Sequence, residues 1–217
     1  MPVRRIEPAA DYARLFDQVK GELAGDAELR ARNFARFQEL GFPNQRAEAW
    51  KYTSLKSLAE TAPAAPAPVG VTLGDLEPYL LTGDVKRLVF VNGFLAAGLS
   101  DIDGLPTGLT VASFDERVSH EGALLADATA ERSLTALNAA MAHGGAVVEV
   151  ADGTDVTTTL QLVFVQAGDA AAMANPRNVV RVGAGAKLEM AETHVALSDT
   201  GVLNMVNSFE VAEAGEL

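Results

Sequence analysis

The residues best suited to chemistry gather in one short stretch, residues 46–55 (RAEAWKYTSL). It contains the only tryptophan of the chain, followed directly by lysine, tyrosine and threonine. Such a group could bind a ligand, or it could pack between two parts of the fold. Because it comes just after a predicted helix stop at Gly41 and Pro43, we interpret it as a packing joint in which Trp50 and Tyr52 lie on the helical region.

The three histidines, His120, His143 and His194, could act as metal ligands or as acid–base groups. None has a second histidine three or four residues away, and no HExxH motif is present. His143 stands at the end of a predicted helix, where a partly charged imidazole is favourable. We therefore predict no metal site and no histidine-based catalysis.

A carboxylate and an imidazole lie two residues apart at Glu192 and His194. Strand alternation places both on the face of Leu188 and Met190, which we expect to turn inward. An inward carboxylate without a partner is costly. We therefore predict that the strand turns a corner or forms a bulge near Ala191.

Several classes of catalytic site are missing from the sequence. The chain has no cysteine, which excludes disulfides, thiolate catalysis and any cysteine-ligated zinc or iron–sulfur site within it. It has no GxSxG motif, and GAGAK lacks the ending of a phosphate-binding loop. Glu189, Glu210 and Glu213 could align across strands as in a glycoside-cleaving site, although an acidic, solvated surface is the simpler interpretation.

The net charge of -12 restricts what the protein can bind. Nucleic acids and anionic membranes both require a cationic surface, so we expect neither as a partner. The N-terminus has no signal-peptide pattern, and no apolar run approaches the roughly 18 residues of a membrane span. We expect a soluble, cytoplasmic protein.

The elements that must position these residues begin with helices. Residues 9–24 and 26–40 carry apolar side chains at helical spacing. Asp26 is a good N-cap for the second helix, Gly41 ends it, and Pro43 prevents its continuation. We therefore predict a helical hairpin at the start of the chain.

From Ala146 onward the pattern changes to strands, with apolar and polar residues alternating between turns rich in glycine, asparagine and alanine. Alternation alone leaves a sandwich, a barrel and a β-helix open. The chain stops in a strand-like run without a cap, so we expect it to be the N-terminal portion of a longer protein. The expected organisation is an N-terminal helical region (1–60), a Pro/Ala-rich linker (61–70), a mixed α/β region (71–143) and the start of a β domain (144–217).

One longer pattern points to a family. The stretch GFPNQRAEAWKYTSL resembles the signature of the SufB/SufD family of iron–sulfur cluster assembly proteins, most closely its D-type (SufD-like) members. Three later stretches resemble the family in the same order: LVFVNGFLAAGLS, LTALNAAMAHGGAVVEV and NPRNVVRVGAGAKLEMAETH. The family-signature residues, which we expect to be structural, are Gly41, Pro43, Arg46, Glu48, Trp50, Lys51, Tyr52, Thr53, Pro176, Arg177 and Glu192.

The resemblance implies a fold and a function. The fold is mixed α and β, with an N-terminal helical region followed by the first rungs of a right-handed parallel β-helix in residues 144–217. The function is that of a non-enzymatic scaffold subunit of an iron–sulfur cluster assembly complex. Its partners are a B-type paralogue and, through a C-terminal region absent from this sequence, an ABC-type ATPase.

The resemblance assigns no catalytic, cofactor-binding or metal-binding residue to this chain. The family's functional histidine lies in later rungs, so its role is not transferred to His194. The iron–sulfur cluster is handled by the whole complex, and we expect this portion to bind no cofactor. A homodimer is left open. The alternative function is a β-helix carbohydrate-active enzyme that uses aligned carboxylates.

Overall fold

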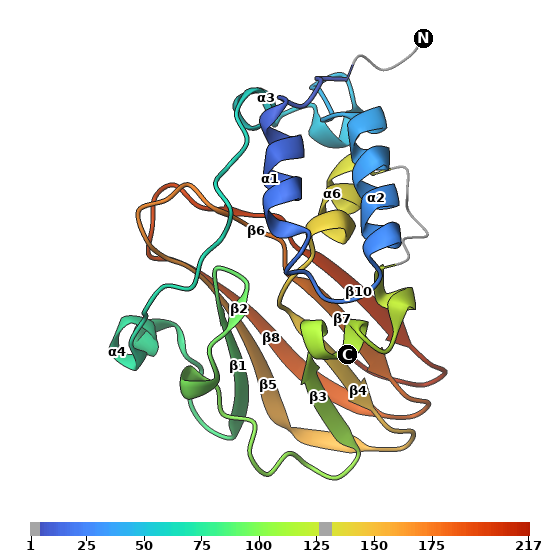
Figure 1. Cartoon of the computed structure of the whole chain (residues 1–217). Coiled ribbons are helices and arrows are strands. Elements are labelled where there is room, and N and C mark those ends of the chain that lie inside the picture. The colour runs from blue at the N-terminus through green and yellow to red at the C-terminus, as the bar shows by residue number, and fades with distance from the viewer. Residues whose placement is uncertain (1–4, 126–131) are drawn as a thin grey trace.

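The molecule has a helical part and a β part, as the computed structural model in Figure 1 shows. The structure describes residues 5–125 and 132–217. The α-helices are α1 (Asp11–Val19), α2 (Ala27–Leu40), α3 (Lys56–Glu60), α4 (Leu73–Leu76), α5 (Phe114–Val118) and α6 (Ser133–Met141). The 3-10 helices are η1 (Glu48–Trp50), η2 (Glu77–Tyr79), η3 (Ala97–Leu99) and η4 (Gly122–Leu125). The strands are β1 (Val85–Val91), β2 (Phe94–Leu95), β3 (Leu109–Ser113), β4 (Ala146–Val150), β5 (Asp155–Gln166), β6 (Met173–Ala174), β7 (Arg177–Val182), β8 (Lys187–Ala196), β9 (Val202–Leu203) and β10 (Val206–Val211).

The ends of α2 follow from local side-chain and backbone chemistry. The side chain of Asp26 accepts hydrogen bonds from two backbone amides of the first turn, as an N-cap does. The helix stops at Gly41, whose φ of 63° suits glycine. A Cβ at this position would lie 2.7 Å from the carbonyl oxygen of Ile6. The predicted N-terminal helical region is confirmed.

Aromatic side chains hold the helical part together. Phe16 of α1 stacks on Phe34 of α2 with ring centroids 4.3 Å apart. Phe42, which follows α2, packs edge-on against Phe37 at 5.3 Å. Leu137 brings α6 into the same buried cluster. Three helices from different parts of the chain thus share one core, which ties the N-terminal segment to the β part.

Among the described residues, the β part consists of two four-stranded sheets and one pair of short strands. The first sheet has the order β2-β1-β5-β8 and the second has the order β10-β7-β4-β3. In each sheet three neighbouring strands run parallel, and an antiparallel strand, β2 or β3, forms one edge. Strands β6 and β9 pair in parallel. Asn92 and Gly93 form the turn between β1 and β2, as an Asn-Gly pair between two strands indicates.

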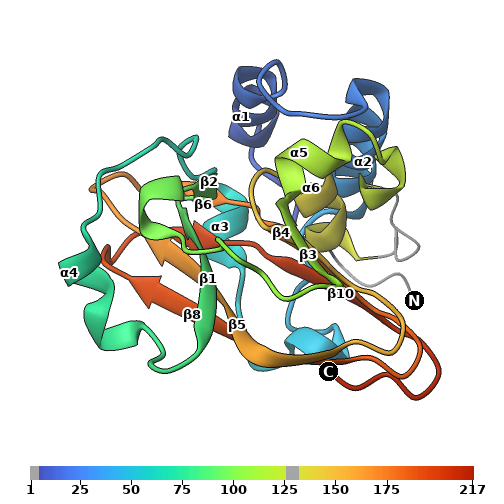
Figure 2. The same ribbon diagram turned by 90° about the horizontal axis from the view of Figure 1, so that it is seen from below.

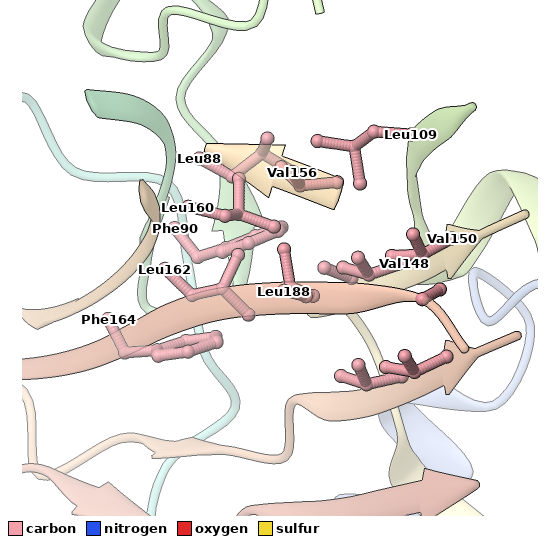
Figure 3. Packing of buried hydrophobic residues seen from close by; sticks show 14 residues of the cluster. Leu88, Phe90, Leu109, Val148, Val150, Val156, Leu160, Leu162, Phe164 and Leu188 are labelled. Atoms are coloured by element: carbon pink, nitrogen blue, oxygen red, sulfur yellow. The ribbon is translucent and has the colours of Figure 1, made fainter. Parts of the chain in front are cut away.

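The main core lies between the two large sheets. Apolar side chains of β1, β5 and β8 meet those of β3, β4 and β7 in one buried cluster, as Figure 3 shows. Phe90 and Phe164 stack in it with ring centroids 5.3 Å apart. Alternate residues of each strand face this space, which is the pattern that the sequence predicts.

The fold class is mixed α and β, with helices at the N-terminus and sheets that contain parallel strands. The finer expectation, a right-handed parallel β-helix, is not shown, because the sheets do not form a uniform solenoid. Strand β2 runs antiparallel to β1 because a tight turn folds it directly back, and β3 runs antiparallel to β4 at the edge of the second sheet. The register of β5 against β8 also shifts between Val156 and Leu160.

Figure 2 shows the same molecule from below, with α4 beside β1 and far from α1 and α2. Residues 61–70 connect the helical part to α4 with no helix, and with one isolated bridge between Ala64 and Ala172. The domain boundaries at 60, 70 and 143 stay predictions. None of the helices described here has the length and apolar character that crossing a bilayer would require.

Candidate functional site

Strand β8 turns two polar side chains toward the space between the sheets. Glu192 pairs in register with Leu162 of β5, and His194 pairs with Phe164. Leu162 and Phe164 belong to the buried core, and neighbours in register share a face of the sheet. The imidazole of His194 accordingly lies 5.9 Å from the ring of Phe164, centroid to centroid.

Glu192 is held there by hydrogen bonds from both sheets. Asn178 on β7 and Asn207 on β10 donate to its Oε2 at 3.3 and 2.9 Å, and Nε2 of His194 lies 2.7 Å from its Oε1. We call Asn178, Glu192, His194 and Asn207 the inter-sheet polar cluster. Part of the cluster stays accessible, since the side chain of Glu192 is 21% exposed and that of His194 is 46% exposed, whereas Asn178 is buried.

The corner or bulge predicted near Ala191 is wrong. Strand β8 itself keeps the inward parity of Leu188 and Met190 through His194, and the register shift lies in the neighbouring β5, between Val156 and Leu160, opposite Leu188 and Met190. The inward carboxylate is tolerated because the amides of Asn178 and Asn207 and the imidazole satisfy it. The two asparagines come from other strands and lie 14 and 15 residues away in the sequence, whereas His194 lies on β8 itself.

Two pairs of asparagines stack across neighbouring turns of the chain. Asn178 donates from Nδ2 to Oδ1 of Asn207 at 2.8 Å, and Asn204 donates from Nδ2 to Oδ1 of Asn175 at 3.0 Å. Both pairs come from a repeated tetrapeptide, first NPRN and then NMVN. This repeat is visible in the sequence, and it is the signal from which the inter-sheet polar cluster could have been predicted.

The signature residues Pro176 and Arg177 connect α6 to the strands. Arg177 is 5% exposed and donates from Nη1 to Oδ1 of Asn138 at 2.9 Å. Asn138 in turn donates to the carbonyl oxygens of Pro176 at 3.0 Å and Asn204 at 2.8 Å. Pro176, Arg177 and Glu192 therefore lie in adjoining hydrogen-bond networks around the asparagine pairs.

The aromatic half of the N-terminal signature turns outward. Trp50, at the end of η1, is half-buried. Tyr52 is 90% exposed, and Nζ of Lys51 lies 5.4 Å from the centroid of its ring. The predicted packing joint is therefore wrong for Tyr52, because Phe42 fills the helical core in its place. The further exposed members of the signature are Arg46, Glu48 and Thr53.

An open hollow of about 940 Å³ lies beside this signature. Trp50 lines one part of it, and Leu203 and Met205 line another. The same two residues, Leu203 and Met205, also line a smaller hollow of about 410 Å³ that contains His194. Leu203 and Met205 thus border both hollows, which places the signature and the inter-sheet polar cluster near the same short stretch of chain.

The inter-sheet polar cluster offers few ligands for a metal. Within residues 5–125 and 132–217, no three histidine, aspartate or glutamate side chains lie close enough together to hold one. Glu192 and His194 form a pair in which a carboxylate fixes one ring nitrogen. Such a pair orients an imidazole, but it falls short of the ligand number that structural or catalytic zinc sites use.

The residues of the alternative glycoside-cleaving site are not brought together. Glu189 contacts Thr159 in the first sheet at 3.3 Å, whereas Glu210 contacts Arg181 in the second sheet, also at 3.3 Å. Glu213 follows β10 and is exposed. The other two histidines also lie apart from these carboxylates, since His120 is exposed after α5 and His143 is buried after α6.

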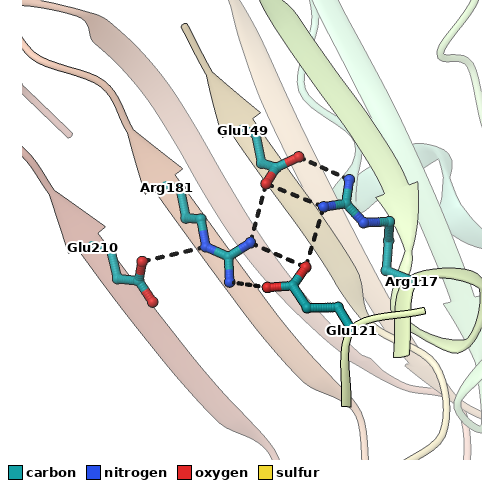
Figure 4. Close-up of polar contacts among 5 residues, drawn as sticks. All are labelled: Arg117, Glu121, Glu149, Arg181 and Glu210. Carbon is teal, nitrogen blue, oxygen red and sulfur yellow. Dashed lines mark hydrogen bonds and ion pairs between the residues drawn. The ribbon is translucent and has the colours of Figure 1, made fainter. Parts of the chain in front are cut away.

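A second group of charges covers the outer face of the β10-β7-β4-β3 sheet (Figure 4). We call Arg117, Glu121, Glu149, Arg181 and Glu210 the outer ion network. Arg117 from α5 and Arg181 from β7 both contact Glu149 of β4, at 2.8 and 3.0 Å. Arg181 also contacts Glu121 at 2.6 Å and Glu210 at 3.3 Å. The network therefore joins α5 and the residues after it to three strands.

Hydrogen bonding within the outer ion network stabilises the ionised carboxylates. The bond from Arg117, followed by that from Arg181, holds the pKa of Glu149 below its usual value. The bond from Arg181, followed by that from Arg117, does the same to the pKa of Glu121. Partial burial opposes both shifts and is outweighed. This network fixes charge in place and exposes no reactive group.

Comparison with known proteins gives one informative relative. A protein of Synechocystis sp., described as an iron–sulfur cluster assembly SufBD family protein, is 30% identical to this chain over 166 residues. The match includes 73% of this chain and 37% of that protein. The chain therefore spans little more than a third of the length of this relative. No family model matches the chain.

Proposed function

The chain belongs to the SufB/SufD family of iron–sulfur cluster assembly proteins, and we propose that it serves as a scaffold subunit in building such clusters. The observation that carries the proposal is the similarity to the cyanobacterial SufBD family protein over most of this chain. The relative's description names assembly of iron–sulfur clusters and no catalysed reaction. We propose the same role here, performed without enzymatic turnover and in the cytoplasm.

The absence of cysteine supports a D-type, SufD-like role for the chain. Thiolates are the usual protein ligands of iron–sulfur clusters, and the sequence contains none. A subunit of this kind needs a partner that supplies them. The proposed partner is a B-type paralogue, and an ABC-type ATPase drives movement between the subunits. The resident cluster then belongs to the complex and not to this chain alone.

We include the parallel β-helix in the proposal, because the strand pairing supports it. Val147 of β4 pairs with Val179 of β7, and Arg177 of β7 pairs with Val206 of β10. Each pairing joins residues roughly thirty positions apart, as successive coils of a solenoid would. The asparagine pairs recur at the same spacing. Continued pairing on the free edges of β8 and β10 would extend both sheets.

The carbohydrate-active alternative is not favoured. It requires carboxylates on both sides of a sugar-binding cleft, within roughly 10 Å of each other. Glu189 and Glu210 are instead engaged in separate sheets. The scaffold role needs no such cleft, because protein surfaces perform it.

The test of the proposed function is recovery of partners from the natural source. The protein is tagged at its chromosomal locus, purified under anaerobic conditions and analysed by mass spectrometry and iron determination. We expect stoichiometric recovery of an ABC-type ATPase and of a cysteine-bearing paralogue, together with iron. Recovery of the protein without either partner or iron would contradict the assembly role and leave the family assignment intact.

A further inference from the structure

The open hollow of about 940 Å³ beside the signature also contains the start of α6. Four consecutive residues, 132–135, line it together with Trp50. Beyond this first turn, residues 136–141 of α6 are buried in the core of the helical part and its surroundings. The hollow therefore receives the N-terminal end of a helix whose remainder is enclosed by the protein.

The first turn of α6 has no cap. Arg132, in the N-cap position, makes no side-chain hydrogen bond to the helix, and its carbonyl oxygen accepts from the amide of Ala136 at 3.0 Å. The amides of Ser133, Leu134 and Thr135 have no acceptor among the residues that the structure describes. Three unpaired N–H groups at the positive end of a helix dipole favour an anion in this position.

The side chain of Ser133 is a second, independent indication of a ligand. Ser133 is 9% exposed and lines the hollow, but its hydroxyl has no hydrogen-bond partner in the described part of the chain. The described side-chain atoms that are both unpartnered and sealed from solvent belong to Arg87 and Asn175, so Oγ of Ser133 keeps access to the hollow. A nearly buried hydroxyl of this kind is placed to donate to a bound molecule.

The charged side chains in the lining favour the same kind of ligand. Arg132 is exposed and forms no ion pair with a described residue. Arg5 lies 4.0 Å from Glu7, at the limit of an ion pair. Among the described lining residues the acidic one is Glu39, which is already paired with Arg36 at 2.7 Å. An anion in the hollow would therefore meet two arginines, although the chain as a whole carries a charge of -12.

The remaining walls indicate what the anion is attached to. Trp50, Leu203 and Met205 line the hollow and are each partly buried. Aromatic and aliphatic surfaces of this kind hold the apolar body of a ligand, while a few polar groups fix its orientation. The volume of the hollow lies within the roughly 300–1,000 Å³ of small-molecule sites.

We propose that this hollow is a binding site for small molecules that carry a phosphate or carboxylate group on an apolar or aromatic body. The first-turn amides of α6, the hydroxyl of Ser133 and the guanidinium group of Arg132 bind the oxyanion, and Trp50 contacts the body. The site goes beyond the proposed role in cluster assembly and does not rest on it, because binding requires no partner subunit.

The test uses Trp50 as a reporter, since it is the only tryptophan of the chain and lines this hollow. The 217-residue chain is titrated at constant ionic strength with phenyl phosphate, benzoate and benzyl alcohol, which share an aromatic ring and differ in the head group. We expect at least one of the two acids to change the fluorescence of Trp50 saturably and to shift the backbone amide NMR signals of residues 133–135. The neutral alcohol should bind at least tenfold more weakly.

The acid that binds more tightly identifies the head group as phosphate or carboxylate. No saturable binding of either acid would overturn the proposal. Binding that leaves the three amide signals unshifted, or equal binding of benzyl alcohol, would also overturn it, because the helix N-terminus would then not recognise the oxyanion.

Two variants and a control test the recognition of the oxyanion. Ser133→Ala removes the hydroxyl donor and should weaken binding of the acid about tenfold, with no change for benzyl alcohol. Arg132→Gln should weaken the acid about fivefold. Arg32→Gln removes the same charge from an exposed arginine that pairs with Glu28 at 3.4 Å outside the hollow, so it should change the affinity less than about twofold. Equal losses in the two arginine variants, or an unchanged affinity in Ser133→Ala, would contradict the proposal.

Discussion

At the scale of single residues, Glu192 shows how a position that looks unfavourable in the sequence becomes stable in the fold. Its parity with Leu188 and Met190 correctly indicates an inward direction. Hydrogen bonds from two side-chain amides and an imidazole stabilise the inward carboxylate. Replacing it by an amide should therefore remove several charge-assisted hydrogen bonds, whereas Glu189 of the same strand accepts one exposed hydrogen bond, from Thr159.

We predict that Glu192→Gln lowers the free energy of unfolding by about 1–3 kcal/mol, because one of its polar atoms would face a donor or acceptor of the wrong kind. Urea denaturation followed by circular dichroism measures the change. Glu189→Gln is the matched control, since Glu189 is exposed on the same strand and should stay within about 0.5 kcal/mol of the unmodified protein. Equal effects of the two substitutions would contradict this account of the cluster.

Tyr52 gives a second prediction at the residue scale. Because its side chain is 90% exposed, Tyr52→Ser should change the free energy of unfolding by no more than about 0.5 kcal/mol. Phe42 is fully buried, so Phe42→Ala should cost about 3–5 kcal/mol. Thermal unfolding of both variants measures these two changes in stability against the unmodified protein. A large loss of stability in Tyr52→Ser would contradict this account and support the interpretation of Tyr52 as part of a packing joint.

The difference between these two aromatic residues marks a limit of sequence reasoning. Large aromatic side chains near a helix end are usually buried, and the sequence offers two candidates, Phe42 and Tyr52, ten residues apart. Only the packing of Phe42 on Phe37 and Tyr12 shows which one fills the core. Lys51, Tyr52 and Thr53 then remain exposed beside the half-buried Trp50, as a surface available to a partner.

At the scale of elements, local signals predicted ends and turns well. Asp26 and Gly41 bound α2, and the Asn92–Gly93 turn joins β1 to β2, as their residue types indicate. Which distant strands pair could not be predicted from the sequence, because alternation sets which side of a strand faces inward but not which strand lies beside it. The antiparallel edges β2 and β3 and the partners of Glu192 depend on such pairing.

The outer ion network gives a prediction about acid stability. The pKa values of Glu121 and Glu149 are lower in the folded protein than their ordinary value. A lowered carboxyl pKa contributes stability that is present above the unfolded pKa, about 4.3, and is lost as the pH falls through the folded pKa. Arg181→Gln removes the central partner, so it should cost about 1–2 kcal/mol at pH 7 and progressively less below about pH 4.

Urea denaturation between pH 3 and pH 7 measures this dependence. Lys56→Gln is the control, because Lys56 forms an exposed pair with Glu60 at 3.7 Å and should contribute less than about 0.5 kcal/mol at any pH. A constant difference between Arg181→Gln and the unmodified protein across this range would show that the arginine acts through packing of its stem and not through the carboxylates.

At the scale of the whole molecule, the two sheets leave β8 and β10 as outer strands whose far edges pair with no named strand of the described structure. Phe209 on β10 is 51% exposed and Val211 is 45% exposed, which places apolar surface beside an open edge. Such edges promote association with other chains. The net charge of -12 opposes that association by repulsion between copies.

Association at the open edge and repulsion between negatively charged copies respond differently to salt, so the balance between them can be tested. Screening shortens the range of repulsion to about 8 Å at 0.15 M salt and about 3 Å at 1 M, while apolar and backbone pairing persists. We predict that the 217-residue chain is mostly monomeric at low salt and associates as sodium chloride is raised toward 1 M, as measured by analytical ultracentrifugation.

Phe209→Glu should suppress this association, because it removes apolar surface and adds charge at the edge. Tyr79→Glu, on an equally apolar but distant surface position in η2, should not. If both substitutions act alike, general charge and not the β10 edge governs association; if neither acts, the edge is not the contact.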